Sequence, residues 1–187
     1  VGLSLTLGGR EVRLLDLTSA FGVLANKGVK QEPVSILKVE DSKGKTLYEY
    51  KESEGIKILD EDIAFIISNI LADNGARTAA FGSNSYLNIA GKTVAVKTGT
   101  TDQKRDNWTI GYTPSVVVGV WVGNNDNTPL DPKIASGVTG ASPVWAAITK
   151  QLLKDKGNEP FDRPSKVIQQ EVDGFLSGKP HGGSPTR

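Results

Sequence analysis

The sequence predicts an α+β fold, in which an antiparallel sheet carries helices packed on it. Segments with helical periodicity stand near the beginning, the middle and the end of the chain. A β-prone hairpin separates the first two, and three consecutive β-prone segments separate the last two. This order differs from the strict alternation of strands and helices that builds a parallel sheet. With 187 residues, of which 37% are hydrophobic, the chain can bury a core of ordinary size.

The first part of the chain predicts a helix followed by a hairpin. Apolar residues recur at helical spacing from Arg13 to Asn26, and Gly28 lies just past the end, as a C-cap should. Residues 34–39 and 46–50 are β-prone and flank the turn-forming residues 41–44. They therefore predict two strands joined by a short turn.

The middle of the chain predicts a second helix and then the strands of the sheet. Asp60 can cap this helix, its first turn is acidic, and Gly75 follows its end. After a loop, strands are expected at 93–96 with the polar residues that follow, at 108–112 and at 116–122. The last of these is apolar at nearly every position, as in a strand buried on both faces, so we expect it at the centre of the sheet.

The end of the chain predicts a final helix and a tail. Apolar residues from Val144 to Leu153 recur at helical spacing, and Gly157 ends the helix. Residues 157–187 are rich in Pro, Gly and charge, which predicts a tail or linker. The chain opens at Val1 without an initiator methionine, so we expect a processed or excised piece.

Composition argues against several kinds of function. The 22 basic and 21 acidic residues leave a net charge of +1, so nothing demands nucleic acid or an anionic membrane as a partner. The absence of cysteine excludes disulfides and thiol catalysis. The single histidine, His181, lacks partners for a histidine triad or a zinc site, so we expect neither metal nor cofactor.

The segment from Lys97 to Thr101, with the sequence Lys-Thr-Gly-Thr-Thr, is the strongest functional signal. It follows an apolar β-prone run and precedes a turn-rich, charged link. The segment places a cation, hydroxyl donors and a residue without Cβ on one short strand, which suits it to hold an anionic substrate. It does not supply a nucleophile.

The surroundings of this motif resemble the transpeptidase domain of class A penicillin-binding proteins, the bifunctional murein synthases. The resemblance covers most of residues 1–155, so residues 1–156 would be the C-terminal portion of that domain. It implies the fold shared by penicillin-binding proteins and serine β-lactamases. Besides the motif and the strand before it, the segments that carry it are residues 2–9, 17–21, 108–122, 116–127 and 137–145.

The resemblance implies a peptidoglycan D,D-transpeptidase, which cross-links D-alanyl-D-alanine stem peptides through an acyl-serine intermediate and is a target of penicillin. Lys97 and Thr100 would be catalytic residues, and Thr98, Gly99, Thr100 and Thr101 would bind substrate. Lys97 would supply positive potential, the hydroxyls of Thr98 and Thr100 would hold the substrate carboxylate, and the Thr100 N–H would be one oxyanion donor. Gly99 would let the substrate backbone come close.

The same resemblance implies partners and a location. The partners would be peptidoglycan stem peptides and β-lactams, without nucleic acid. A membrane anchor and a glycosyltransferase domain are expected upstream because the family has them, which places the intact protein at the extracytoplasmic face of a bacterial cell membrane. This chain itself has no apolar stretch of about 18 residues, the length that suggests a membrane span.

In this family the nucleophilic serine belongs to a Ser-x-x-Lys motif. The tetrapeptide from Ser35 to Lys38 has this spacing, but it lies in a predicted strand, where residues three apart point to opposite faces. A nucleophile and its base need the same-face geometry of a helix, so we reject Ser35. The family's Ser-x-Asn motif is absent. We therefore expect an upstream segment of the same protein to carry the serine, and this chain alone to be inactive.

Two other functions remain open. One is a hydrolytic relative, a serine β-lactamase or D,D-carboxypeptidase, and the other is a non-catalytic binding module with the same fold. The segment from Asp106 to Asn127 resembles the class A synthases more than the hydrolases. Trp108, Tyr112 and Trp121 are interpreted as core and sheet-face aromatics rather than as residues that stack on substrate.

Overall fold

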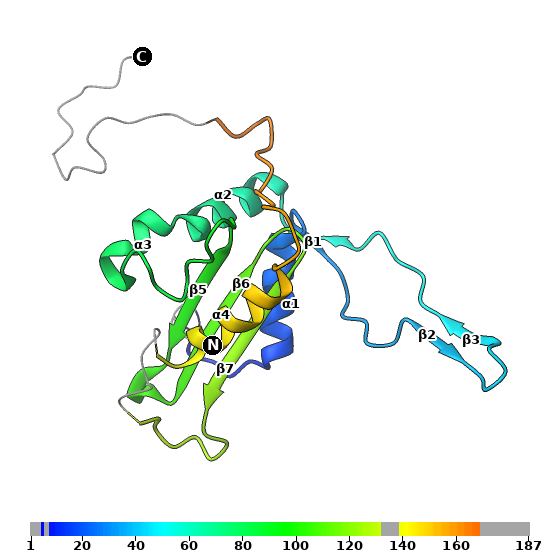
Figure 1. Ribbon diagram of the computed structural model, residues 1–187, viewed down its shortest axis with the longest axis horizontal. Helices are drawn as coiled ribbons and strands as arrows, with labels where there is room; N and C mark the ends of the chain where they lie inside the picture. The colour runs from blue at the N-terminus through cyan, green and yellow to red at the C-terminus, as the bar shows by residue number, and fades with distance from the viewer. Residues whose placement is uncertain (1–4, 6–7, 132–138, 169–187) are drawn as a thin grey trace.

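A central antiparallel sheet carries helices on both faces, which confirms the predicted α+β class (Figure 1). The computed structural model describes residue 5 and residues 8–131 and 139–168. The short 3-10 helix η2 (Asp102–Lys104) joins the first two strands of the sheet, and both neighbouring pairs are antiparallel. In the order in which they pair, the strands are β5 (Ala95–Thr100), β6 (Asp106–Tyr112) and β7 (Val117–Gly123).

Helices α1 and α4 cover opposite faces of this sheet, and α2 packs against α1 and β5 (Figure 1). A Cβ added at Gly111 would meet the indole of Trp145 on α4, whereas one added at Gly119 would meet Thr18 of α1. None of the helices in the described part of the chain is long and apolar enough to cross a membrane. These helices are α1 (Leu14–Ala25), α2 (Glu61–Ala72), α3 (Asn74–Phe81) and α4 (Ala141–Leu152).

The core between the sheet and α4 centres on Trp145. Its side chain is 0% exposed and lies over Gly111, where the missing Cβ leaves room for the indole ring. Leu153, just past α4, belongs to the same cluster. Its other large aliphatic residues come from the sheet and from the segment that leads into it, and they are Leu87, Ile89, Val94, Val96, Val118 and Val120. This face of the sheet therefore depends on one large aromatic side chain.

The core on the α1 face centres on Tyr112. Its ring lies edge-on to Phe21 and Phe161, at centroid distances of 6.1 and 5.6 Å. Its hydroxyl shares a 2.9 Å hydrogen bond with Ser68, and burial raises the pKa of Tyr112. Tyr112 is thus a core aromatic, as the sequence predicted.

Helix α3 occupies a stretch that the sequence analysis treated as the end of one helix and the beginning of a loop. Gly75, expected to follow the second helix, lies inside α3 instead. The Asp73 side chain caps α3 by accepting a 3.0 Å hydrogen bond from the Ala76 N–H. Asp60 does precede α2, but its carboxylate pairs with Lys57 at 2.8 Å instead of capping the helix. Asp60 and Asp73 thus directly precede α2 and α3, but only Asp73 makes a capping hydrogen bond.

The strand expected at the centre of the sheet lies at its edge in the described residues. β6 pairs on both sides, while β7 pairs only with β6. The apolar character of β7 has another cause, because α1 and α4 both contact it, one on each face. Burial of both faces therefore did not require two neighbouring strands.

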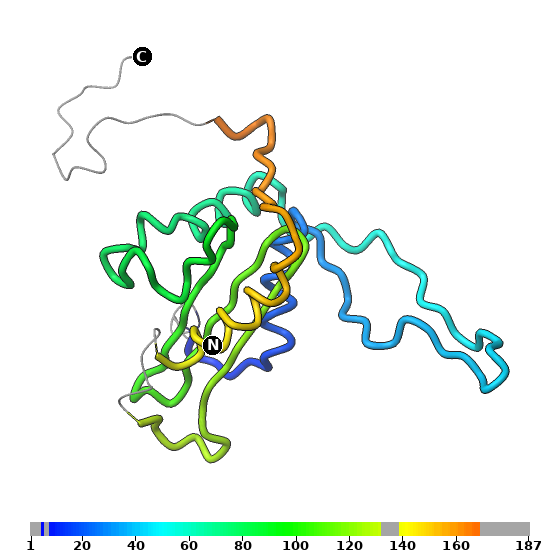
Figure 2. The backbone as a smooth tube through the Cα atoms, in the orientation of Figure 1, coloured from blue at the N-terminus to red at the C-terminus, as the bar shows by residue number. Residues whose placement is uncertain are grey.

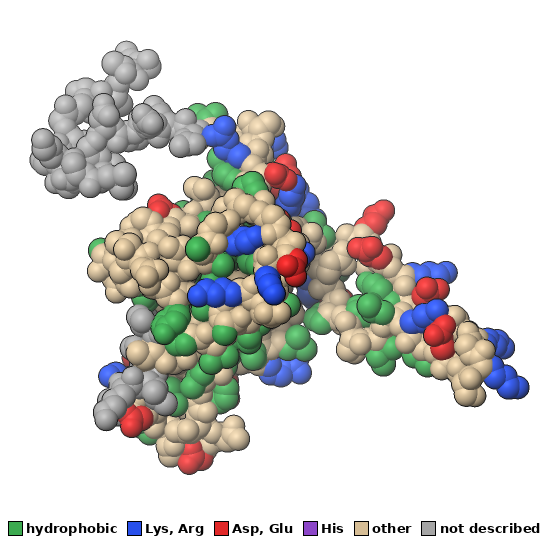
Figure 3. Space-filling view, viewed as in Figure 1, with side chains coloured by type: hydrophobic (Ala, Val, Ile, Leu, Met, Phe, Trp, Pro, Cys, Tyr) green, Lys and Arg blue, Asp and Glu red, His purple; other side chains and the backbone are tan. Residues whose placement is uncertain are grey.

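The predicted hairpin projects from the body of the molecule as an arm, whose path out and back is clear in Figure 2. Its strands, β2 (Lys38–Glu40) and β3 (Thr46–Glu49), are shorter than predicted. The pair formed by β1 (Val29–Lys30) and β4 (Ile56–Lys57), which the sequence did not indicate, closes the base of the arm. Hydrophobic side chains lie on the surface of the arm, with lysines around its tip (Figure 3).

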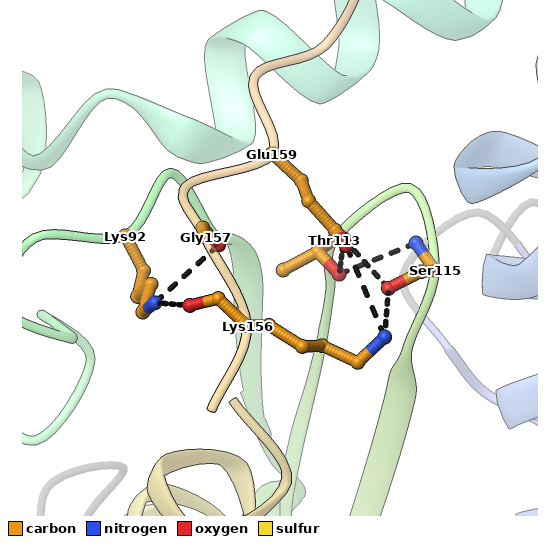
Figure 4. A network of polar contacts seen from close by, with 6 residues as sticks. All are labelled: Lys92, Thr113, Ser115, Lys156, Gly157 and Glu159. Carbon is orange, nitrogen blue, oxygen red and sulfur yellow. Dashed lines mark hydrogen bonds and ion pairs between the residues drawn. The ribbon is translucent and has the colours of Figure 1, made fainter. Parts of the chain in front are cut away.

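The chain after α4 has no regular secondary structure up to residue 168, yet it is anchored to the sheet (Figure 4). Lys92 Nζ donates to the carbonyls of Lys156 and Gly157. Ser115 Oγ and Thr113 Oγ1 donate to Glu159 at 2.6 and 3.2 Å. The first residues of the predicted tail therefore lie against the body of the domain, while residues 169–187 are outside the described residues.

We expect this anchor to weaken at acid pH. The hydroxyl of Ser115 and, to a smaller extent, that of Thr113 lower the pKa of Glu159. A lowered folded pKa gives stability that is present above the ordinary carboxylate pKa and is lost as the pH falls through the folded value. Glu159→Gln should therefore lower the melting temperature at about pH 7, and the difference should be smaller at about pH 3.

Thermal unfolding at both pH values measures this effect. Asp155→Asn is the matched control, because Asp155 is an exposed carboxylate on the same segment. It should change the melting temperature little at either pH. An equal loss for Glu159→Gln at both pH values would contradict the proposed anchor.

Candidate active site

The predicted motif forms the outer strand of the sheet. Among the described residues β5 pairs only with β6, and the motif occupies the C-terminal half of β5. The side chains of Lys97 and Thr100 are exposed, and Thr98 and Gly99 are half-buried. The sequence-predicted residues are therefore brought together along one accessible edge, whereas Thr101 lies just past the end of the strand.

The direction of the backbone groups on this edge follows from the pairing with β6. The Thr101 N–H donates to the Asp106 carbonyl at 3.1 Å, so this residue points toward β6. Since antiparallel pairing alternates, the N–H and C=O groups of Thr98 and Thr100 point the other way, toward the open edge. Lys97 Nζ donates to the Thr98 carbonyl at 2.5 Å, which turns its ammonium to the same edge. A cation and the Thr100 N–H donor thus face the space beside the sheet.

Gly99 is not required by packing within the sheet. A Cβ at this position would lie 3.5 Å from Cβ of Trp108, which is an ordinary contact distance. The backbone conformation of Gly99 does not require a glycine either, since it is not among the glycines with positive φ. A ligand that needs close approach to the backbone would explain the glycine.

Asp106 fixes the end of the motif. Its carboxylate accepts hydrogen bonds from Thr101 Oγ1 and from Trp121 Nε1, each at 2.9 Å. Its own N–H donates to Thr101 Oγ1 at 2.9 Å. The Thr101 hydroxyl is thus held within the protein, and Asp106 links all three strands of the sheet. Asp106 was expected within the segment that resembles the class A synthases, but the sequence alone did not indicate this role.

The tryptophans beside Asp106 are sheet-face residues, as predicted. Trp108 and Trp121 are cross-strand partners on β6 and β7, with ring centroids 6.4 Å apart. Both are half-buried. Their packing, together with the Trp121 bond to Asp106, supports the start of β6, where the chain leaves the turn that follows the motif.

The described residues place no Ser-x-x-Lys tetrapeptide on a helix. Ser35 precedes β2, and Lys38 pairs with Glu40 at 2.7 Å. A second tetrapeptide with this spacing, from Ser42 to Lys45, escaped the sequence analysis and forms the turn of the arm. The arm projects from the side of the molecule away from β5 (Figure 1). Neither serine is therefore positioned to act on a substrate held at β5.

An antiparallel sheet between helices, with a Lys-Thr-Gly strand at its open edge, is the arrangement expected of a penicillin-binding transpeptidase. Residues 3–153 match the family model described as the penicillin binding protein transpeptidase domain. The chain belongs to this family. The predicted family resemblance is confirmed.

Curated relatives of this chain include penicillin-binding protein 2D of Bacillus subtilis, which is 32% identical over 94% of this chain and 26% of the relative. Penicillin-binding protein 1A of Aquifex aeolicus is 33% identical over 88% of this chain and 22% of the relative. The chain thus spans about a quarter of the length of these relatives. The name of the second agrees with the predicted resemblance to class A proteins.

Solved structures show the same fold. Penicillin-binding protein 1A of Haemophilus influenzae superposes with a TM-score of 0.80 at 24% identity, covering 97% of this chain and 32% of that one. The PonA1 protein of Mycobacterium tuberculosis in complex with penicillin V has a TM-score of 0.71 at 30% identity. That match covers 88% of this chain and 44% of PonA1.

Proposed function

We propose that this chain forms one wall of the active site of a peptidoglycan D,D-transpeptidase. The observation that carries the proposal is the open edge of β5, which the Lys97 ammonium and the Thr100 N–H both face in a member of this family. A stem peptide that ends in D-alanyl-D-alanine has an anionic carboxylate and a carbonyl for such groups to bind. The relative solved with penicillin V supports a β-lactam as a second ligand class.

The proposed reaction has two steps. A serine hydroxyl attacks the carbonyl of the penultimate D-alanine, its proton passes to the leaving amine, and the terminal D-alanine departs. An amine of a neighbouring stem peptide then attacks the acyl-serine, releases the serine hydroxyl and forms the cross-link. The chain contributes the Thr100 N–H as an oxyanion donor and the Lys97 charge with the Thr98 and Thr100 hydroxyls for the terminal carboxylate.

The serine belongs to a part of the protein outside this sequence. The two Ser-x-x-Lys tetrapeptides of this chain lie on the arm, off any helix. An upstream segment of the same protein is therefore the required partner, and the intact protein works on peptidoglycan at the extracytoplasmic face of the membrane. The Thr101 hydroxyl, already bonded to Asp106, contributes by fixing the end of the motif strand.

Fluorescent penicillin tests the proposal. The intact protein should be labelled covalently, and this chain alone should remain unlabelled. Changing Ser35 or Ser42 to Ala in the intact protein should leave labelling unchanged. Absence of labelling in the intact protein would contradict a transpeptidase, and labelling of the isolated chain at either serine would contradict the assignment of the nucleophile to another segment.

A further inference from the structure

Asn107 lies behind the motif strand and connects it to the start of α4. It sits on β6 directly opposite Thr100, and its side chain is fully buried. Its Nδ2 donates to Thr100 Oγ1 at 3.1 Å, and its Oδ1 accepts from the Ala141 N–H at 2.7 Å. The Asn107 amide therefore spans from the motif to the first residue of α4.

The orientation of this amide is fixed by chemistry. A backbone N–H can only donate, so the atom of Asn107 that faces Ala141 must be the oxygen. The amino group must then face Thr100, and it can only donate there. The Thr100 hydroxyl consequently accepts on the side of Asn107, and its own hydrogen is left for an acceptor elsewhere.

A second buried contact holds Asn107 in place. Thr109 lies two residues after Asn107 on β6, and Ser142 directly follows Ala141 on α4. Their hydroxyls share a 3.0 Å hydrogen bond. Both side chains are 0% exposed. Two neighbouring bonds therefore tie β6 to α4, and the Asn107 amide has little freedom to turn away from Thr100.

We propose that Asn107 is a positioning residue that makes the Thr100 hydroxyl a hydrogen-bond donor to the substrate carboxylate. The inference rests on the function proposed above, in which Thr100 binds that carboxylate. Without the Asn107 donor, the Thr100 hydroxyl could donate into the protein and present a lone pair to the anion. Asn107 thus contributes to the preference for anionic substrates without touching the substrate itself.

Asn107→Asp tests this polarity with almost no change of shape. An aspartate still accepts from Ala141, but its second oxygen accepts from Thr100 and takes the hydroxyl hydrogen away from the substrate. The measurement is the rate constant for acylation of the intact protein by benzylpenicillin and by its uncharged methyl ester. We expect the ratio of the two rate constants to fall by about tenfold, the size of one hydrogen bond to a charged group.

Two further variants separate this role from others. Thr109→Val removes the neighbouring bond to α4 without reaching Thr100, so it should leave the ratio unchanged. In a Thr100→Val background, Asn107→Asp should change the ratio little. An equally large fall in that background would assign the effect to charge repulsion and overturn the proposal.

Other outcomes are equally decisive. If Asn107→Asp slows acylation by both reagents by the same factor, the role of Asn107 is purely structural. That result would overturn the inference and leave the proposed function intact. A wild-type protein acylated by neither reagent would overturn the proposed function itself. If Asn107→Asp does not fold, Asn107→Ala removes the same donor without adding charge, and an unchanged ratio in that variant would overturn the inference.

Discussion

Lys97→Ala should slow acylation of the intact protein by penicillin by about 100-fold or more, the range found when one preorganised group is removed from a catalytic site. The Lys97 ammonium is turned toward the open edge of β5 by its bond to the Thr98 carbonyl. Within the described residues it forms no ion pair with a carboxylate, so its charge is available to an anionic ligand. The rate constant for acylation is the measurement.

Lys104→Gln is the matched control for Lys97. Lys104 is an exposed lysine on η2, in the turn that follows the same strand, and removing its charge changes the net charge of the chain equally. It should leave the rate constant for acylation within about twofold of the wild-type value, because salt screens the interaction of an exposed charge with a ligand that does not contact it. If Lys97→Ala acylated as fast as the wild type, Lys97 would have no role in binding or catalysis.

The sequence was sufficient to predict the parts of the site that lie on one strand. A cation, hydroxyls and a glycine in consecutive positions after an apolar run predicted the strand β5, and the chemistry of these residues stays a prediction. The residues behind that strand were not predicted, because their roles depend on pairing across the sheet. Asn107 meets Thr100 only through the β5–β6 register, and it meets Ala141 only through the packing of α4.

The fold could be predicted to a similar extent. The helices at residues 14–25, 61–72 and 141–152 had clear periodicity, and all three contact the sheet. The isoleucines that form the apolar face of α2 are nevertheless exposed, and they are Ile63, Ile66, Ile67 and Ile70. Helix α3 is only eight residues long and none of its residues is buried, so the cap at Asp73 was its main signal. The position of β7 could not be inferred from its composition, because helices on both faces bury a strand as fully as neighbouring strands do.

Trp145→Ala should destabilise the chain by about 3–5 kcal/mol, the usual cost of deleting a large buried aromatic side chain. Trp145 is 0% exposed and fills the space above Gly111 between α4 and the sheet. Gly111 has no side chain that could move into the cavity, so little of the loss should be recovered by relaxation. Urea unfolding of the wild-type and variant chains measures the difference.

Two other changes on α4 separate loss of packing from loss of the helix. Trp145→Phe should cost less than Trp145→Ala, because a phenyl ring keeps much of the apolar contact and removes the indole N–H, which has no hydrogen-bond partner among the described residues. Val144→Ala, at a position that is 48% exposed, should change stability by less than about 1 kcal/mol.

The Ala141 N–H at the start of α4 donates to the oxygen of Asn107, so Trp145→Ala should also weaken the support that Asn107 gives to Thr100. Equal losses for Trp145→Ala and Val144→Ala would mean that α4 is held by its backbone contacts rather than by the indole in the core.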